Sequence, residues 1–275
     1  MDSTIPALQR SANEMRIDII RMLQAAASGH PGGSLSIIDI LTVLFFRWIK
    51  RTPENVADPD RHRFILSKGH GVPALYAVLA RCGVIPHEDL QGLRKVHSYL
   101  QGHPHNGSLP AVEASTGSLG QGLSIAQGMA MAAKLDGKPY KVYCVMGDGE
   151  SQEGQAWEAL LSAPHHMLDN LIVVLDYNKG QIDGPTNSVL NLEPVADKLR
   201  AFNWDVQEVD GHDLEAFDKA VARAQEENGH PHFIIAHTVK GKGVSFMEHP
   251  TEWHGKAPNA AEAEVAIKEL EALLN

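Results

Sequence analysis

The order of apolar and polar residues along the chain predicts helices at its start. Apolar side chains spaced three and four residues apart predict a helix over 5–27, and a second apolar run predicts a helix over 37–49. Ser36 is expected to cap the second helix, and Asp39 would lie in its first turn, where a negative charge suits the helix dipole. The glycine-rich segment 28–34 is expected to be a loop.

Farther along, short apolar runs alternate with amphipathic stretches. Strands are predicted over 63–66, 141–146, 171–175, 204–209 and 233–239. Helices are predicted over 72–82, 157–167, 194–202, 214–227 and 260–274, with a loop over 241–259. This alternation is typical of an α/β fold, doubly wound, with a mainly parallel sheet and helices on both faces. No domain boundary is evident, so 1–275 is expected to form a single domain.

Composition narrows the class of protein. Hydrophobic residues make up 43% and charged residues 21%, as in ordinary globular proteins. The net charge of −10 argues against binding to nucleic acid or to an anionic membrane. Cys82 and Cys144 lie in apolar runs, as buried thiols do in reducing compartments. Because the sequence shows neither a signal peptide nor an apolar run long enough to span a membrane, we expect a cytoplasmic location.

Polar residues follow two of the predicted strands. Strand 141–146 leads into Gly147-Asp148-Gly149, and Asn178 follows the next strand, with 28 residues between Gly149 and Asn178. Gly-Asp-Gly alone would be an ordinary turn. A carboxylate, an amide and a backbone carbonyl at one edge of a sheet, however, are oxygen donors that suit Mg²⁺ or Ca²⁺. A helix starting after Gly149 would offer free N–H groups to phosphates, so the pattern predicts a divalent-metal and diphosphate site.

These residues carry a family resemblance. Gly147-Asp148-Gly149 followed by Asn178 resembles the thiamine-diphosphate-binding motif. Six other segments, in the family's order, resemble transketolase: Ser28-Gly29-His30-Pro31-Gly32, Ser67-Lys68-Gly69-His70-Gly71, Gly102-His103-Pro104, Thr116-Gly117-Ser118-Leu119-Gly120-Gln121-Gly122, Ile182-Asp183-Gly184 and Asp210-Gly211-His212-Asp213. The resemblance covers essentially the whole chain and stops where the family's N-terminal diphosphate-binding domain ends. The chain thus resembles the N-terminal subunit of a split transketolase.

The resemblance implies a role for individual residues. The side chains of Asp148 and Asn178 and the carbonyl of Gly180 would hold Mg²⁺ or Ca²⁺. The remaining residues implied to bind thiamine diphosphate are His70 and Gly149 at its diphosphate and Gly117, Ser118 and Leu119 at its aminopyrimidine. The catalytic histidines would be His30, His103 and His254, of which His254 would also contact the cofactor. Glu153 would be a buried acid that links two active sites across a dimer.

The resemblance also implies an activity and a partner. Transketolases use thiamine diphosphate to move a two-carbon ketol unit from a ketose phosphate to an aldose phosphate. In the family, a glutamate from the pyrimidine-binding domain of the neighbouring protomer activates the cofactor. A C-terminal transketolase subunit would supply that domain here, most simply in an α2β2 heterotetramer.

Two other functions remain open at this point. The α subunit of a 2-oxo-acid dehydrogenase also has a Gly-Asp-Gly to Asn motif, although it lacks the Ser-Lys-Gly-His-Gly and Thr-Gly-Ser-Leu-Gly-Gln-Gly segments. A non-catalytic subunit could keep the same fold without activity. The pairs His165-His166 and His230-Pro231-His232 have no carboxylate or cysteine at metal-ligand spacing, and we interpret them as structural residues.

Overall fold

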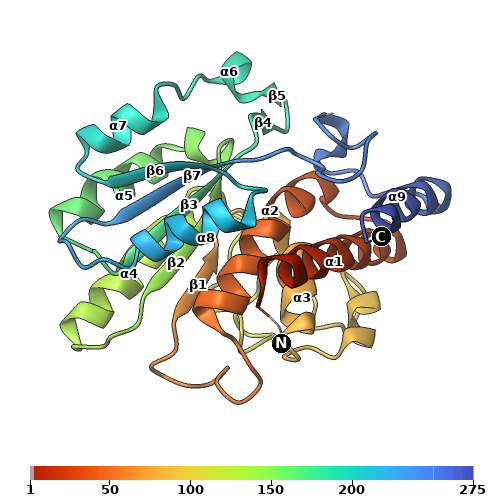
Figure 1. Cartoon of the computed structure of the whole chain (residues 1–275), viewed down its shortest axis with the longest axis horizontal. Helices are drawn as coiled ribbons and strands as arrows, with labels where there is room; N and C mark the ends of the chain where they lie inside the picture. Colours follow the sequence, from red (N-terminus) through yellow and green to blue (C-terminus); the bar gives the residue numbers. More distant parts are fainter. Residues whose placement is uncertain (1–2, 250, 275) are drawn as a thin grey trace.

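A parallel sheet forms the centre of the molecule (Figure 1). The structure is a computed structural model that describes residues 3–249 and 251–274. The sheet contains β1 (Arg63–Leu66), β2 (Val142–Gly147), β3 (Leu171–Tyr177), β6 (Asp205–Asp210) and β7 (His232–His237). They lie in the order β1-β2-β3-β7-β6, and each neighbouring pair is parallel. The predicted parallel α/β fold is confirmed.

Helices cover both faces of this sheet, so it has two cores. On one face, alternate residues such as Val145, Val174 and Ile234 pack against α1 (Ile5–Ala26), α2 (Pro31–Val43), α3 (Val72–Arg81) and α8 (Leu214–Arg223). On the other face, their neighbours Cys144, Val173 and Ile235 pack against α4 (Gln121–Leu135), α5 (Gly154–His165) and α7 (Val195–Ala201). Since successive strand residues point to opposite faces, β2 and β3 are completely buried, and they are apolar except for Asp176 near the end of β3.

Helix α2 starts earlier than predicted. It begins at Pro31, a residue that suits the first helical turn, so the expected loop over 28–34 ends at residue 30. Ser36 therefore lies inside the helix and is not its N-cap. Asp39 also lies in the helix interior, buried against Arg16. The glycines that suggested a loop are needed for close packing instead, because a Cβ at Gly32 would lie 3.0 Å from Lys240 Cγ.

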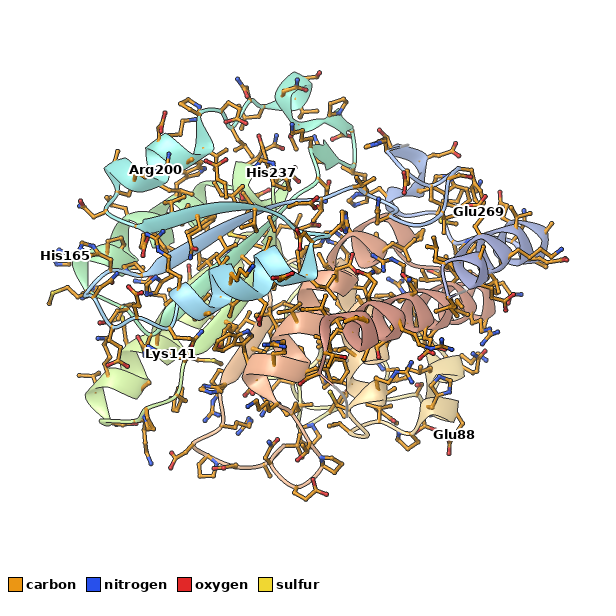
Figure 2. The ribbon with its side chains drawn as sticks, in the orientation of Figure 1. Glu88, Lys141, His165, Arg200, His237 and Glu269 are labelled. Atoms are coloured by element: carbon orange, nitrogen blue, oxygen red, sulfur yellow. The ribbon has the colours of Figure 1, made fainter. Side chains whose placement is uncertain are left out.

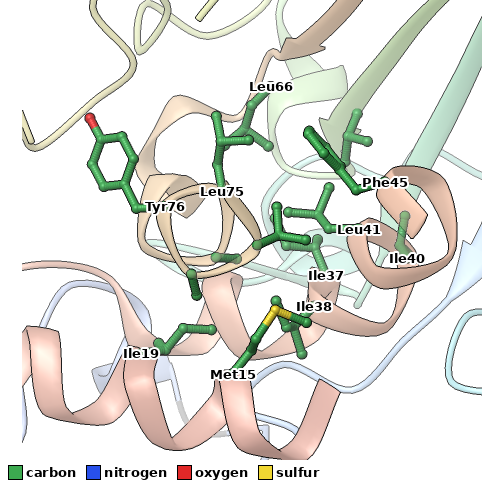
Figure 3. Close-up of a cluster of buried hydrophobic side chains, with 14 of the residues drawn as sticks. Met15, Ile19, Ile37, Ile38, Ile40, Leu41, Phe45, Leu66, Leu75 and Tyr76 are labelled. Carbon is green, nitrogen blue, oxygen red and sulfur yellow. The ribbon is translucent and has the colours of Figure 1, made fainter. Parts of the chain in front are cut away.

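The apolar helix is correspondingly longer than the sequence indicated. It continues into a π-helical turn, η1 (Leu44–Ile49), and the stretch Pro31–Ile49 is long and apolar enough to cross a membrane. However, 83% of that stretch is buried inside the domain. Figure 3 shows Ile37, Ile38 and Leu41 packed among side chains that include Met15 and Leu75. The burial identifies it as a core helix of this domain.

Several further elements complete the chain. Helix α4 was not predicted, because Gly122, Gly128 and several alanines weaken its apolar periodicity. The predicted loop 241–259 contains a short 3₁₀ turn, η5 (Thr251–His254). The other elements are η2 (Gly69–Gly71), η3 (His87–Gly92), η4 (Glu150–Gln152), β4 (Gly180–Gln181), β5 (Gly184–Pro185), α6 (Thr186–Val189) and α9 (Ala260–Ala272). The remaining predicted helices and strands lie within a few residues of those observed.

Candidate functional site

A cavity of about 340 Å³ lies where the parallel strands end. Its walls come from the segments that follow β1, β2, β3 and β7, as expected for a ligand site in a parallel sheet. The predicted site residues that line it are His70, Leu119, Asp148, Gly149, Glu153, Asn178, Gly180 and His254. Residues far apart in the sequence therefore meet in one place.

Four histidines cluster beside this cavity. The ring of His30 lies 5.3 Å from that of His70, 6.1 Å from that of His103 and 5.6 Å from that of His254, measured between centroids. His70 and His254 are 5.1 Å apart. Thus His30 and His103, which do not line the cavity themselves, are joined to it through ring contacts. Within the described residues, the buried Nδ1 of His30 has no hydrogen-bond partner.

The environment keeps these histidines neutral. Burial, with Arg94 next in effect, lowers the pKa of His30 to about 4. Burial and then Lys240 lower the pKa of His254 to about 3. The pKa values of His70 and His103 are also lowered, chiefly by burial. Neutral imidazoles can both donate and accept hydrogen bonds, which suits contacts with sugar hydroxyls.

Asp148 occupies the carboxyl end of β2, where it is 1% exposed. Its Oδ1 accepts a hydrogen bond from the backbone N–H of Gly149 (2.8 Å), and its Oδ2 accepts one from that of Lys179. Burial and the nearby Asp176 carboxylate raise the pKa of Asp148 to about 7. A bound divalent cation would restore the charged form, so this carboxylate fits a metal ligand.

Asn178 lies next to this carboxylate, after β3. Its Nδ2 donates to Asp176 Oδ2 (2.8 Å), and its Oδ1 accepts from the backbone N–H of Gly180 (3.0 Å). Asp176 is itself fully buried and forms an ion pair with Lys68. Burial favours the protonated acid, but Lys68 and several hydrogen bonds outweigh it and keep the pKa of Asp176 below its usual value.

The cavity also fits an anionic group. Lys240 is 3% exposed, and its Nζ lies 2.9 Å from His254 Nδ1. Burial, followed by the repulsion of Lys68, lowers the pKa of Lys240 to about 8. Among residues 3–249 and 251–274, no carboxylate lies within ion-pair distance of Lys240. Asp148 and Asp176 attract this ammonium only from beyond that distance. A diphosphate would supply a counter-charge in direct contact with the buried ammonium.

Close backbone approaches shape the two glycine motifs. A Cβ at Gly149 would lie 2.6 Å from Gln181 Cβ, so the turn after β2 can press against the loop that follows Asn178. Gly117 has a φ of +132°, and a Cβ there would lie 2.8 Å from the His103 ring. Gly117, Ser118 and Leu119 therefore run past His103, with Leu119 reaching the cavity.

One expectation about this region is wrong. The helix after Gly149 begins only at Gly154, and the N–H groups of Ser151, Gln152 and Glu153 bond to carbonyls of the turn before it. They are therefore not free for phosphates. In the single chain the side chain of Glu153 is exposed and lies on the cavity lining. The buried acid of this turn is Glu150, which points inward toward Ser67. Whether a second chain covers Glu153 stays a prediction.

Acidic and histidine side chains alone do not form a metal site here. In the described part of the chain, no group of three or more His, Cys, Asp or Glu could hold a metal ion. The predicted set of metal ligands is different from such a group, because it combines one carboxylate with an amide and a backbone carbonyl. Such a sparse set is typical of Mg²⁺, which keeps waters and phosphate oxygens among its ligands.

Sequence reasoning missed four buried charged residues of the site. Lys68 and Lys240 lie inside glycine-flanked segments, Ser67-Lys68-Gly69 and Val239-Lys240-Gly241, and these flanks were the available signal. Asp176 is two residues before Asn178, and Glu150 directly follows the Gly-Asp-Gly motif. Their roles depend on contacts between distant segments, which the sequence alone does not display.

The other histidine pairs are consistent with structural roles. His232 is fully buried, and its Nε2 lies 2.8 Å from the carbonyl of Glu226. The Nδ1 of His230 lies 3.0 Å from the carbonyl of Asn203. The rings of His165 and His166 meet edge to face, and Figure 2 shows His165 at the edge of the molecule.

Comparison with known proteins identifies the family. The model for the transketolase thiamine diphosphate binding domain matches residues 7–271. The chain belongs to the transketolase family. It is 44% identical to the 6-deoxy-6-sulfo-D-fructose transketolase subunit SqwG of Clostridium sp. (strain MSTE9), over 96% of both chains. It is 40% identical to one subunit of the apulose-4-phosphate transketolase of Phocaeicola vulgatus, over 97% of this chain and 94% of that protein.

Solved transketolase structures share the fold. The transketolase from Campylobacter jejuni superposes with a TM-score of 0.91 at 37% identity, covering 98% of this chain and 43% of that one. The chain thus spans less than half the length of that transketolase, and the matched part is the family's thiamine diphosphate binding domain. Thiamine diphosphate is accordingly the cofactor of this domain, and a divalent metal is typical of the family.

Proposed function

We propose that the chain is the N-terminal subunit of a two-chain transketolase that transfers a two-carbon ketol unit from a ketose or ketose phosphate to an aldose or aldose phosphate. The observation that carries this proposal is the convergence of Asp148 and Asn178 with the four-histidine cluster at one cavity. It is supported by relatives that match over nearly their whole length and are themselves named as transketolase subunits.

The metal and diphosphate would be held at the inner end of the cavity. Asp148, the Oδ1 of Asn178 and the carbonyl of Gly180 are the proposed ligands of Mg²⁺ or Ca²⁺. The residues proposed to contact the diphosphate are His70, Gly149, His254 and, in addition to the predicted set, Lys240. The buried charges of Lys240 and Asp148 support this, because each lacks compensation that the bound group would bring.

The aminopyrimidine end would lie along the backbone of Gly117, Ser118 and Leu119. Thiamine diphosphate, when bound, supplies the carbanion chemistry that breaks and forms the carbon–carbon bond. The protein's own groups bind, orient and move protons. Neutral His30, His103 and His254 can donate to a sugar oxygen that gains negative charge and accept a proton from a hydroxyl, a contribution typically worth about 10²- to 10⁴-fold in rate.

The proposed partner is a C-terminal transketolase subunit with the pyrimidine-binding domain and the glutamate that activates the cofactor. We propose an α2β2 heterotetramer in which the exposed Glu153 becomes a buried link between two active sites. A cytoplasmic location, with no role for nucleic acid or membrane, is the simplest setting for sugar phosphate substrates. The charge of −10 supports this setting.

Sequence similarity does not identify the particular sugars that this chain would act on. Relatives that are 40–44% identical are named for different substrates, a sulfonated deoxyfructose and apulose 4-phosphate. What these names share is ketol transfer. We therefore propose a ketose donor and an aldehyde acceptor, and we assign discrimination between sugars mainly to the partner.

An assembly assay tests the proposal. The 275-residue chain alone should not turn over a ketose phosphate, and addition of a subunit with the pyrimidine-binding domain should produce metal- and cofactor-dependent turnover. Asp148→Ala should abolish that turnover, whereas Asp136→Ala, at the end of α4, should not. Turnover by the chain alone would contradict the need for a partner. Turnover of pyruvate in place of a ketose would favour a 2-oxo-acid dehydrogenase, and full activity of Asp148→Ala would favour a non-catalytic subunit.

A further inference from the structure

The carboxylate of Asp176 connects four segments at the bottom of the site. It is the next-to-last residue of β3 and is 0% exposed. Its Oδ2 accepts hydrogen bonds from the Ser36 hydroxyl (2.8 Å), the Lys68 ammonium and the Asn178 amide (2.8 Å). Its Oδ1 accepts from the Thr238 hydroxyl. The donors belong to α2 and to the segments that follow β1, β3 and β7.

One of these donors is a proposed metal ligand, and its amide is held in one orientation. Asn178 Nδ2 faces Asp176, and Asn178 Oδ1 faces the backbone N–H of Gly180. Rotating the amide by 180° would place its oxygen against a carboxylate and its NH₂ against an N–H group. Both new contacts would be repulsive, so Asp176 and Gly180 together present the amide oxygen, and not the nitrogen, on the side of Gly180.

Asp176 itself is not arranged as a metal ligand. Its Oδ2 already receives three donors, one of them the charged Lys68, whose Nζ also donates to the carbonyl of Gly33 (3.0 Å). A carboxylate oxygen with this many donors has no lone pair left for a cation. Apart from its charge, which raises the pKa of Asp148, Asp176 can therefore act on a metal through Asn178.

We propose that Asp176 is a positioning residue that turns the amide oxygen of Asn178 toward the metal, and that it makes an amide, and not a carboxylate, the required group at position 178. The inference rests on the proposed function, because it takes Asn178 as a ligand of the divalent metal. It explains why the site uses an amide although carboxylates are the stronger ligands of Mg²⁺. A carboxylate at 178 would have no hydrogen to donate to Asp176 and would be repelled by it.

The test is a cycle of Asp176→Asn, Asn178→Asp and the double variant in the full chain assembled with its partner subunit. The probe is Mn²⁺ with thiamine diphosphate, and free Mn²⁺ is measured by electron paramagnetic resonance. Asp176→Asn should weaken Mn²⁺ binding by about 10- to 100-fold, as is usual when the support of a ligand is lost. Asn178→Asp should also weaken it. The double variant should bind more tightly than Asn178→Asp, because the new amide at 176 can donate to the new carboxylate at 178.

Ser36→Ala is the matched control, since it removes one donor from the same carboxylate and leaves the Asn178 contact in place. It should keep close to wild-type Mn²⁺ affinity, and thermal melting of the metal-free proteins should show that all variants are folded. If Asp176→Asn fails to fold, the test rests on Asn178→Asp alone. Tighter Mn²⁺ binding by Asn178→Asp than by the wild type would then overturn the inference. A double variant no better than Asn178→Asp would overturn it equally. Absence of Mn²⁺ binding by the wild-type assembly would instead contradict the proposed metal site.

Discussion

Glu150 joins three loops that the proposed site requires. Its Oε1 accepts hydrogen bonds from the Ser67 hydroxyl (2.5 Å) and the backbone N–H of Gly120 (3.0 Å), and its Oε2 accepts from the N–H of Gly147 (3.1 Å). These contacts tie the segment after β1, the Gly117–Gly120 loop and the end of β2 to one buried carboxylate. A displaced Glu150 would therefore disturb the segments that we propose to hold the two ends of the cofactor.

Replacement of this carboxylate by an amide should be costly. Glu150→Gln places an NH₂ group where both oxygens now accept N–H donors, which leaves a buried donor unpaired at a cost of about 1–3 kcal/mol. We expect the free energy of unfolding of the chain to fall by that amount and thiamine diphosphate to bind more weakly. Urea unfolding and cofactor titration measure the two effects. Glu158→Gln, exposed on α5, is the control, and equal stability of the two variants would contradict the role of Glu150.

The neutral state of His30 predicts a dependence of stability on pH. The pKa of His30 is about 4 in the folded chain against an ordinary value of 6.5, so between these values the unfolded chain binds the extra proton. Its neutral form therefore stabilises the fold above pH 6.5, and this contribution is lost as the pH falls toward 4.

A pairwise comparison isolates this effect, since Asp148 titrates in the opposite sense in both proteins. We expect the Tm of the wild type relative to that of His30→Gln to decrease as the pH is lowered from about 7 to about 5. The exposed His165 provides the control variant, His165→Gln, whose Tm difference from wild type should not change with pH. A constant difference for His30→Gln would show that His30 is not held neutral.

At the scale of elements, a buried ionic network fastens α1 to α2. The Arg16 guanidinium donates to Asp39 Oδ1 (3.0 Å) and to the carbonyl of Lys242 (3.2 Å). His212 Nδ1 lies 2.7 Å from Asp39 Oδ2, and its Nε2 accepts from the backbone N–H of Val239 (2.8 Å). The network therefore connects the two helices to the segment that leads into Lys240 and supports the cavity from behind.

Loss of one member of this network should destabilise the fold strongly. Arg16→Met leaves the Asp39 carboxylate buried without its counter-charge, for which about 3–5 kcal/mol is typical. Arg10→Met on the same helix removes an exposed pair with Glu14 and should cost at most about 1 kcal/mol. Equilibrium urea unfolding of both variants provides the measurement. Similar losses would mean that Asp39 is compensated by His212 alone.

The order of apolar and polar residues predicts some of the helices and strands better than others. The strands were predictable because a parallel sheet covered on both faces needs continuous apolar runs, as in residues 142–147 and 171–175. The start of α2 and the whole of α4 could not be predicted in this way. Their glycines break the local apolar pattern, and they are needed because other segments pack closely against them. A Cβ at Gly122, for example, would lie 2.4 Å from Ser67 Oγ. Such glycines signal a tertiary contact that no window of sequence contains.

At the scale of the whole molecule, the sequence pointed to the residues now proposed as ligands but not to the residues that support them. Asp148, Asn178 and the histidines were found because they belong to motifs with recognisable spacing. Asp176 and Lys240 were missed because the proposed role of Asp176 depends on a hydrogen bond to Asn178, and that of Lys240 depends on a charge buried at the cavity. Both properties arise only when the ends of β1, β3 and β7 meet.

The exposed position of Glu153 gives a prediction for the assembled enzyme. Glu153→Cys should react rapidly with a maleimide in the isolated chain and slowly after the partner subunit is added, because we propose that assembly buries this position. The native cysteines contribute little background, since Cys144 is buried and burial raises the pKa of Cys82 to about 12.

Glu88→Cys, at an exposed position of η3 (Figure 2), should react equally fast in both states and controls for the reagent. Mass spectrometry after timed labelling measures both rates. Equal protection of the two positions would indicate a general loss of reactivity on mixing. Unchanged labelling of Glu153→Cys in an assembly that turns over a ketose would place the subunit interface elsewhere and remove Glu153 from the proposed link between active sites.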